Sequence, residues 1–314
     1  MMTGGVLVVG DANVDLVVQG DVIPRFGQAE QLLDVADLVL GGSASIVAIG
    51  LARLGVDTSL AAVVGDDEFG GVMRAALAVD GVRLDALHTH PTLPTGISVI
   101  LSTSEDRSIL TLPGTVPLLT AAEVRDAVGL LAPGHVHFAS YFLQPSLAAE
   151  LPELLAWLRA RGVATSLDTN WDPAERWAGV MELLPLIDYL FPNVEELRAI
   201  AATLDEVHDA DEDAARSLAA LGPTVVVKAG RAGGWSMDAR GTVVRAPGLE
   251  VEVVDTTGAG DSFDAGYLAA IAHGVDSERD RLRWAAVAGS LSTLGRGGTR
   301  AQPTLTELRS RLSK

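Results

Sequence analysis

Apolar runs of strand length alternate with helical patterns along most of the chain. The continuous apolar runs at 5–10 and 225–228 are typical of strands buried on both faces of a parallel sheet. Further strands are predicted at 56–65, 136–140, 163–168 and 189–192, and helices at 68–79, 121–131, 146–161, 195–202 and 211–221. Alternation through short loops predicts an α/β fold, with a parallel sheet covered by helices on both faces.

Two regions, about 13–40 and 92–112, interrupt this alternation because their patterns predict strands with no helix between them. The predicted strands lie at 31–40, 95–101 and 108–112, with a polar turn at 102–107. We interpret both regions as a small β lid beside the main domain; they also fit ordinary edge strands of the main sheet. No linker divides the chain, so residues 1–314 are predicted to form a single domain. The apolar strand predicted at 35–40 would leave an exposed edge on the lid, and such an edge favours burial against another molecule. This predicts a homodimer formed through the lid.

The composition limits the partners that the chain can bind. Its 314 residues carry a net charge of −18, which argues against nucleic acid because phosphates need a basic surface. A local nest of amides can still hold phosphate inside an acidic protein. The absence of cysteine excludes disulfides, thiolate chemistry and cysteine-ligated zinc. No apolar run is long enough to cross a bilayer and residues 1–5 lack the features of a signal segment, so a cytoplasmic protein without membrane contact is expected.

The stretch DTTGAGDSFDAGYL, residues 255–268, carries the clearest chemical signal. A strand is predicted at 249–254 and a helix after the glycines, so several backbone N–H groups are left free at a helix N-terminus. Such a terminus is a ready anion site. Asp261 places a carboxylate beside it, and a base next to a phosphate cradle indicates phosphoryl transfer to a hydroxyl. The structural alternative is a glycine-rich turn with Thr256 or Thr257 as the N-cap.

A second polar group, D-x-N-x-D at 11–15, follows the first predicted strand. This is the edge at which open α/β sheets bind ligands. The spacing is that of a calcium loop, but Leu16 and Val22 stand where such a loop needs glycine and glutamate. Two interpretations remain open: a polar turn, or acceptors for sugar hydroxyls.

Other nucleotide and metal motifs fit poorly. The chain has no GxxxxGK[ST] loop, and the first strand is not followed by GxGxxG, which disfavours a P-loop kinase and an NAD-dependent dehydrogenase. The pairs His88–His90 and His135–His137 could ligate zinc, but neither has a third ligand at a motif spacing, which favours core or surface histidines.

The whole 255–268 string resembles the second signature of the ribokinase-like (PfkB) carbohydrate kinase family. The resemblance implies a ribokinase-like three-layer α/β/α sandwich with a mostly parallel central sheet and a small β-sheet lid. It also implies ATP-dependent phosphorylation of a primary hydroxyl on a small carbohydrate, with Mg²⁺ and a monovalent cation, K⁺, as further cofactors.

Further residues fall into the family's order, and their roles are what the resemblance implies. Asp261 would be the base, and the amides of Gly258, Ala259 and Gly260 the anion hole. The substrate would be bound by the first signature and the N-terminal pair: Asn13, Asp15, Gly41 and Gly42. The nucleotide side would comprise Asn193, Glu196, Lys228, Gly230 and Gly233, with Glu196 organising magnesium through water. Asp255 and Thr257 would bind the monovalent cation together with the small-residue segment 285–297.

Two departures from the family pattern bear on the substrate. Ile46 stands where the first signature usually has asparagine, so a sugar hydroxyl contact is lost or supplied by another residue. This argues against a plain ribose-type substrate and favours a deoxy sugar or a nucleoside. The stretch 168–173 resembles D-x-N-[WY]-R-P of keto-sugar acid and fructose kinases, but Asp172 replaces its arginine, which favours a neutral substrate. Trp171 could line a sugar or base pocket. A nucleoside kinase is the alternative enzyme, and a silent sugar or nucleoside sensor the alternative class.

Overall fold

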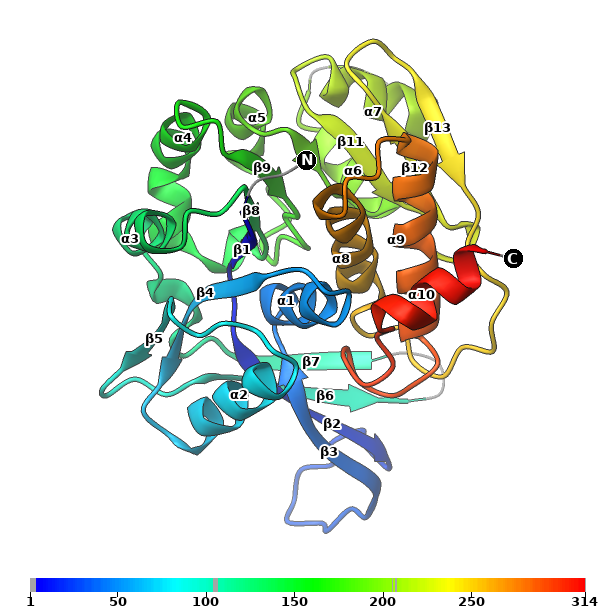
Figure 1. The fold of residues 1–314 in the computed structure, drawn as a ribbon. Helices are drawn as coiled ribbons and strands as arrows, with labels where there is room; N and C mark the ends of the chain where they lie inside the picture. Colours follow the sequence, from blue (N-terminus) through cyan, green and yellow to red (C-terminus); the bar gives the residue numbers. More distant parts are fainter. Residues whose placement is uncertain (1–3, 104–106, 205, 207, 314) are drawn as a thin grey trace.

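A computed structural model describes residues 4–103, 107–204, 206 and 208–313, and a large sheet occupies the centre of the molecule (Figure 1). Its strands are β1 (Val6–Val9), β4 (Thr58–Gly65), β5 (Leu87–His90), β8 (His135–Phe138), β9 (Ala164–Leu167), β10 (Tyr189–Leu190), β11 (Thr224–Lys228), β12 (Gly234–Met237) and β13 (Val243–Ala246). Their spatial order is β13-β12-β11-β10-β9-β8-β1-β4-β5. Neighbouring strands from β5 to β11 run parallel to each other. Strand β12 pairs antiparallel with β11, and β13 pairs antiparallel with β12.

Helices cover both faces of this sheet and enclose two apolar cores. One face carries α1 (Ser43–Arg53), α2 (Glu68–Val79), α8 (Ala259–Ala272), α9 (Glu278–Ser292) and α10 (Leu305–Leu312). The other carries α3 (Ala121–Leu131), α4 (Pro145–Arg159), α5 (Val180–Leu183), α6 (Val194–Ala201) and α7 (Asp211–Ala219). Successive residues of β1 alternate between the two cores, as the two-residue period of a strand requires. The predicted three-layer α/β/α sandwich with a mostly parallel sheet is confirmed.

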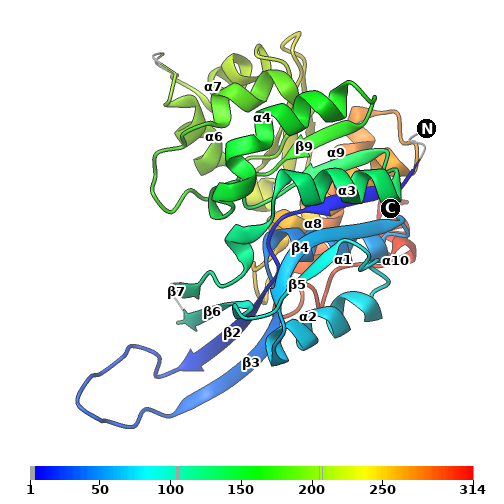
Figure 2. The same ribbon diagram turned by 90° about the vertical axis from the view of Figure 1, so that its left-hand side faces the viewer.

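A second sheet, which we call the lid, contains β2 (Asn13–Gly20), β3 (Leu33–Gly41), β6 (Gly96–Ser102) and β7 (Arg107–Leu112). Its order is β3-β2-β6-β7, with β2 and β6 parallel and the outer pairs antiparallel. The hairpin of β2 and β3 extends well away from the main body (Figure 2). The turn predicted at 102–107 includes residues 104–106, which lie outside the described residues.

Helix starts follow local capping chemistry. Asp67 caps α2 by accepting a hydrogen bond from Gly70 N, and Thr120 forms a capping box with Glu123 at the start of α3.

Short 3-10 helices occur at η1 (Val116–Leu118), η2 (Tyr141–Leu143), η3 (Leu184–Leu186) and η4 (Gly230–Ala232). Within the described part of the chain, no helix is both long and apolar enough to cross a membrane.

The strand predicted at 249–254 is wrong. These residues form no strand, and the chain leaves the sheet after β13, which ends at Ala246. Leu249, Val251 and Val253 instead line a cavity beside α8. Their alternating apolar pattern therefore reflects a cavity wall and not a paired strand.

Candidate active site

The polar residues singled out in the sequence gather at the carboxyl edge of the central sheet. The chain leaves β1 toward Asp11, β9 toward Asp168 and β11 at Lys228, and these three parallel strands end at the same edge. Helices α1 and α8 begin beside them and pack against each other. Side chains from distant segments thus meet at one place, as the topology of an open α/β sheet leads one to expect.

The N-terminus of α8 is open, whereas that of α1 is occupied. Asp11 accepts hydrogen bonds from Ser43 N at 3.1 Å and Ala44 N at 2.9 Å, so its carboxylate fills the start of α1. The N-cap of α8, Gly258, has φ 69° and no side-chain cap. Ala259 N donates to the carbonyl of Thr256 at 3.2 Å, and the amides of Gly258 and Gly260 donate to no described residue. Two free amides and the helix dipole make this end of α8 an anion site.

Asp261 lies in the first turn of α8 and contacts α1 directly. The Ser43 hydroxyl hydrogen-bonds to Asp261 Oδ1, and Asn170 Nδ2 donates to Ser43 Oγ at 2.9 Å. Burial raises the pKa of Asp261 to about 7, against the effect of the Ser43 hydrogen bond, which lowers it. A carboxyl group that titrates near neutral pH is suited to accept a proton from a hydroxyl group.

A buried ammonium lies beside the same helix turn. Lys228 Nζ is 2.5 Å from Asp168 Oδ2 and 3.5 Å from Asp264 Oδ2. Burial alone would lower the pKa of Lys228, but Asp168, Asp264 and Glu196 hold it above its ordinary value. Burial raises the pKa of Asp264 well above its usual range, and the nearby charge of Lys228 opposes this effect. Lys228 and Asp168 remain a charged pair.

The four predicted substrate residues lie together where the lid joins the main body. Asn13 Nδ2 donates to Asp15 Oδ1 at 2.9 Å, and Asn13 pairs with Gly41 across β2 and β3. A Cβ on Gly41 would lie 2.3 Å from the Asp15 carboxylate, and one on Gly42 would lie 3.0 Å from Asn13 Oδ1. Only glycine leaves room at these two positions for the polar pair.

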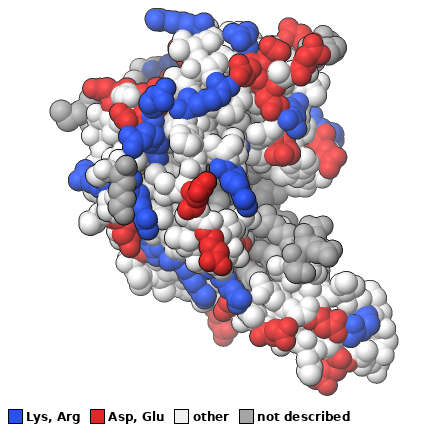
Figure 3. Space-filling model, turned by 90° about the vertical axis from the view of Figure 1, so that its right-hand side faces the viewer, with Lys and Arg blue, Asp and Glu red and all other residues white. Residues whose placement is uncertain are grey.

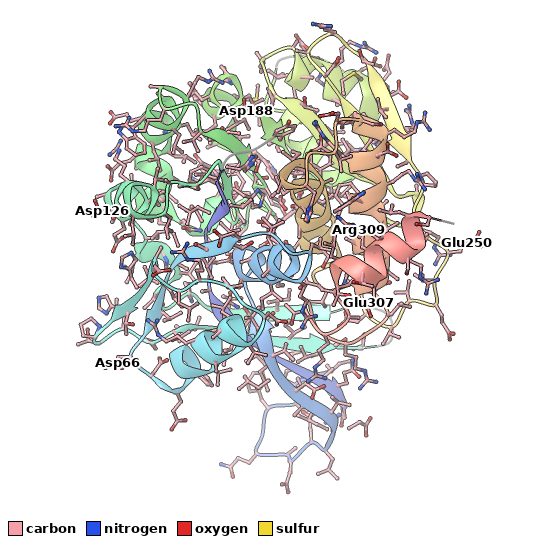
Figure 4. All side chains as sticks on the ribbon, in the orientation of Figure 1. Asp66, Asp126, Asp188, Glu250, Glu307 and Arg309 are labelled. Atoms are coloured by element: carbon pink, nitrogen blue, oxygen red, sulfur yellow. The ribbon has the colours of Figure 1, made fainter. Side chains whose placement is uncertain are left out.

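A cavity of about 760 Å³ opens on the other side of the α8 N-terminus. Its wall contains Lys228, Gly230 and Gly233 from the predicted nucleotide segment, together with Ala259 and Gly260. Ala286, Gly289, Ser290 and Thr293 of the small-residue segment line it as well. Glu250, another lining residue, is exposed at the outer edge of the molecule (Figure 4). The cavity is large enough for a nucleotide.

Asn193 and Glu196 form a capping box at the start of α6. Glu196 N donates to Asn193 Oδ1 and Asn193 N donates to Glu196 Oε2, each at 2.8 Å. The backbone of Asn193 also bridges to Lys228, which brings the pair to the site. Burial raises the pKa of Glu196 to about 7. The described residues hold no group of three or more His, Asp or Glu placed to bind a metal ion.

Asp255 joins the two loops predicted to hold a monovalent cation. Its Oδ1 accepts hydrogen bonds from Thr257 N at 2.9 Å and Thr257 Oγ1 at 2.7 Å, while its Oδ2 accepts one from Gly297 N at 2.9 Å. These oxygens lie next to the open end of α8. An all-oxygen set of this kind suits a hard cation.

The two departures from the family pattern have structural explanations. Ile46 is buried and packs against the backbone at Gly258 and Gly298, so it supports the α8 loop. The Asp172 carboxylate accepts hydrogen bonds from the amides of Ala174, Arg176 and Trp177. Asp172 therefore fixes its own loop through these three hydrogen bonds.

The histidine pair of β8 is a core feature. His135 and His137 are fully buried, and both ring systems hydrogen-bond to Ser166 Oγ, at 2.7 and 2.8 Å. Burial lowers the pKa of His135 to about 3 and that of His137 to about 4, so both rings are neutral at physiological pH.

Sequence reasoning did not assign a role to several residues of this cluster, namely Ser43, Asn170, Asp168 and Asp264. Asp168 and Asn170 belong to the D-x-N stretch, which gave a signal without a role. Ser43 gave none, because nothing local marks one serine among many as the partner of a carboxylate 218 positions away.

Known proteins resemble this chain over nearly its whole length. Residues 4–305 match the model of the pfkB family carbohydrate kinases. An ATP-dependent ribose-1-phosphate kinase of Halopiger xanaduensis is 32% identical over 95% of each chain, and a Klebsiella pneumoniae fructokinase is 31% identical over 96% of this chain and 97% of its own. The structure of Arabidopsis thaliana ribokinase complexed with ribose and ATP superposes with a TM-score of 0.84 at 26% identity, covering both chains completely. The chain therefore belongs to the pfkB family of carbohydrate kinases, phosphotransferases that use an alcohol group as acceptor.

Proposed function

We propose that the chain transfers the γ-phosphoryl group of ATP to a primary hydroxyl of a small carbohydrate. The observation that carries this proposal is the open N-terminus of α8, with Asp261 in its first turn. On one side of this helix end is the cavity that Lys228 and Gly260 line. On the other side, Asp11 and Ser43 meet at the edge of the sheet. ATP would occupy that cavity, and the sugar hydroxyls would bind Asn13 and Asp15 beneath the lid.

In the transfer step a bond forms between the acceptor oxygen and the γ-phosphorus while the bond from that phosphorus to the β,γ-bridging oxygen breaks. Asp261 takes the proton of the acceptor hydroxyl, and the free amides of Gly258 and Gly260 stabilise the charge on the γ-phosphoryl oxygens. Removing one such donor generally costs roughly 3–4 kcal/mol of barrier. The Ala259 amide, which donates to the carbonyl of Thr256 in this structure, would have to exchange that bond for the phosphate to join them.

Two metal ions would assist this chemistry. Glu196 would organise Mg²⁺ through water, which neutralises charge on the β- and γ-phosphates when bound. The buried carboxyl group of Glu196 suits this role because a nearby cation favours its charged form. Asp255 and Thr257 would hold K⁺ next to the open end of α8, where both loops already converge on one carboxylate.

The acceptor is a sugar in this proposal, and a nucleoside is the alternative. The aromatic residues Tyr141, Phe142, Trp171 and Trp177 contact one another in series beside the site, and Trp171, which follows Asn170, is 48% exposed. An exposed indole of this kind can stack on the apolar face of a sugar or on a base. A coupled ADP-release assay with ribose, fructose, 2-keto-3-deoxygluconate, adenosine and cytidine separates the sugar kinase from the nucleoside kinase.

The variant Asp261→Asn tests the role of the base. We expect its kcat to fall about 10²–10⁴-fold, because the proton acceptor is lost while the shape of the site is kept. ATP binding, measured by calorimetry, should persist. Asp126→Asn, an exposed acid-to-amide change on α3 (Figure 4), is the matched control and should keep wild-type turnover. Near wild-type turnover in Asp261→Asn would exclude the mechanism, and tight ligand binding without turnover in the wild type would favour a sensor.

A further inference from the structure

Asn170 is held in a single orientation at the end of β9. Its backbone has φ 52°, and its Oδ1 accepts a hydrogen bond from Ser140 N at 2.7 Å. A backbone amide can only donate, so this contact identifies the oxygen end of the side-chain amide. The nitrogen end, Nδ2, then faces Ser43 Oγ at 2.9 Å and Asp168 Oδ2 at 3.4 Å.

The orientation of Asn170 determines the direction of the next hydrogen bond. Because Asn170 Nδ2 donates to Ser43 Oγ, the Ser43 hydroxyl hydrogen is free to point to its other neighbour, Asp261 Oδ1. Ser43 thus donates to the carboxylate. In the described part of the chain, Asp261 Oδ2 accepts no hydrogen bond from the protein.

We propose that Asn170 and Ser43 form a directional hydrogen-bond relay that holds Asp261 Oδ1, so that Oδ2 is the oxygen that takes the acceptor proton. Both are positioning residues, since they act through Asp261. The inference rests on the proposed function, in which Asp261 is the base. It adds a reason why Asp261 ionises more readily than its burial alone would allow, and why one of its two oxygens is left for the acceptor proton.

Several charged groups surround Asp261, and the relay acts against most of them. Asp168 from the end of β9, Asp11 from the end of β1 and Asp264 from α8 itself each disfavour a further negative charge. Lys228 from β11 favours it, as does the Ser43 hydroxyl. A hydrogen bond donated to the charged form lowers a carboxyl pKa. Loss of the relay should therefore raise the pH at which Asp261 ionises.

The test is the pH dependence of kcat between pH 5 and 9. In Ser43→Ala the midpoint of the acidic limb should rise by about one pH unit, because a hydrogen bond to a charged group is lost. Asn170→Gly, which tolerates the positive φ, should shift the midpoint in the same direction by less. Ser43→Thr keeps a hydroxyl and should restore the wild-type midpoint.

The matched control is Ser45→Ala in the same helix, since the Ser45 hydroxyl donates to the carbonyl of Asp11 and does not contact Asp261. Its midpoint should stay at the wild-type value. A fall in kcat in Ser43→Ala that is equal at every pH would show a merely structural role and overturn the relay, as would an unchanged midpoint. If Asp261→Asn keeps its turnover, the proposed function itself fails, whatever Ser43→Ala does.

Discussion

Asp261 is a carboxyl group whose position favours chemistry over stability. Burial raises its pKa from 3.8 to about 7. A group whose pKa is raised in the folded state contributes its stability at low pH, and that contribution is lost as the pH rises through the folded pKa. Above about pH 7 the folded protein therefore holds a charge that the unfolded chain accommodates more easily.

The same Asp261→Asn variant should consequently be more stable than the wild type, by an amount that grows as the pH rises from about 4 to above 7. At pH 8.5 the amide removes a charge that is partly buried, and we expect a gain of about 1–3 kcal/mol in the free energy of unfolding. At pH 5 the folded-state carboxyl group is still protonated while the unfolded one is ionised, so the gain should be smaller, and it should vanish only below about pH 4. Urea unfolding at the two pH values measures the difference. The exposed Asp126→Asn control should show no such pH dependence, and an equal effect of Asp261→Asn at both values would refute the buried charge.

The sequence identifies some individual residues of the site and not others. Asp261 could be found because a long unbroken string surrounds it. Ser43 and Asn170 could not be assigned roles, because their contact depends on how two helix starts and a strand end meet in space. Asp172 has a local role that the sequence did not indicate, since its carboxylate accepts hydrogen bonds from three backbone amides of its own loop; the preference for a neutral substrate stays a prediction.

The start of α8 depends on a glycine in a conformation that other residues rarely adopt. Gly258 has φ 69°, and a Cβ there would lie 2.7 Å from the Cα of Gly298. Gly258→Ala should lower the free energy of unfolding by about 1–3 kcal/mol through backbone strain, with a further loss from the clash, and should weaken the anion site. Thermal unfolding and the KM for ATP measure the two effects.

Gly81→Ala is the matched control for this strain. Gly81 has a similar φ of 83°, but a Cβ there would meet no atom within 4 Å. The control should cost about 1 kcal/mol of stability and leave kinetics unchanged. If the two variants lose equal stability and neither changes the KM for ATP, the close approach of Gly258 to Gly298 contributes neither to stability nor to ATP binding.

Elements with strong local signals were predicted well. The bounds predicted for 68–79 and 121–131 are those of α2 and α3, because Asp67 and Thr120 supply capping side chains at the right places. The strand predicted at 249–254 is wrong because an alternating apolar pattern indicates only that alternate side chains are buried. It does not show whether a paired strand or another part of the protein buries them. Apolar residues on alternate positions line the cavity there, and no neighbouring strand pairs with the segment.

The whole molecule has an uneven surface. On the face that carries α9, α10 and β13, basic side chains lie in separate groups with acidic ones among them, and the projecting lid carries mainly acidic side chains (Figure 3). The segment 13–40 contains five acidic residues and one arginine. Neither region offers the continuous basic surface that nucleic acid binding needs.

The two faces of the lid differ in chemistry. Asn13, Asp15 and Ser98 share one face, toward the proposed substrate. The opposite face carries a row in register across all four strands: Leu38, Leu16, Val99 and Leu110. Leu38 is 43% exposed and Leu110 58% exposed at the two ends of this row. An apolar row that ends in exposed leucines on both edge strands is a surface that favours burial against another molecule.

We propose that a second copy of the chain covers this row, so that the protein is a homodimer through its lid. Light scattering after size-exclusion chromatography should give twice the chain mass of 32.6 kDa for the wild type. Leu110→Glu should give a monomer, because a charge on each copy would be buried without a partner at the contact. Leu130→Glu changes an exposed leucine on α3, 67% exposed and outside the lid, and should remain dimeric. A wild type that stays monomeric at concentrations well above those of the activity assay would refute the dimer, as would a Leu110→Glu variant that stays dimeric. The apolar row lies on the lid face away from Asn13 and Asp15, so the substitution does not touch the proposed substrate residues. Turnover per chain in the monomeric variant therefore tests separately whether the lid needs its partner to hold the substrate.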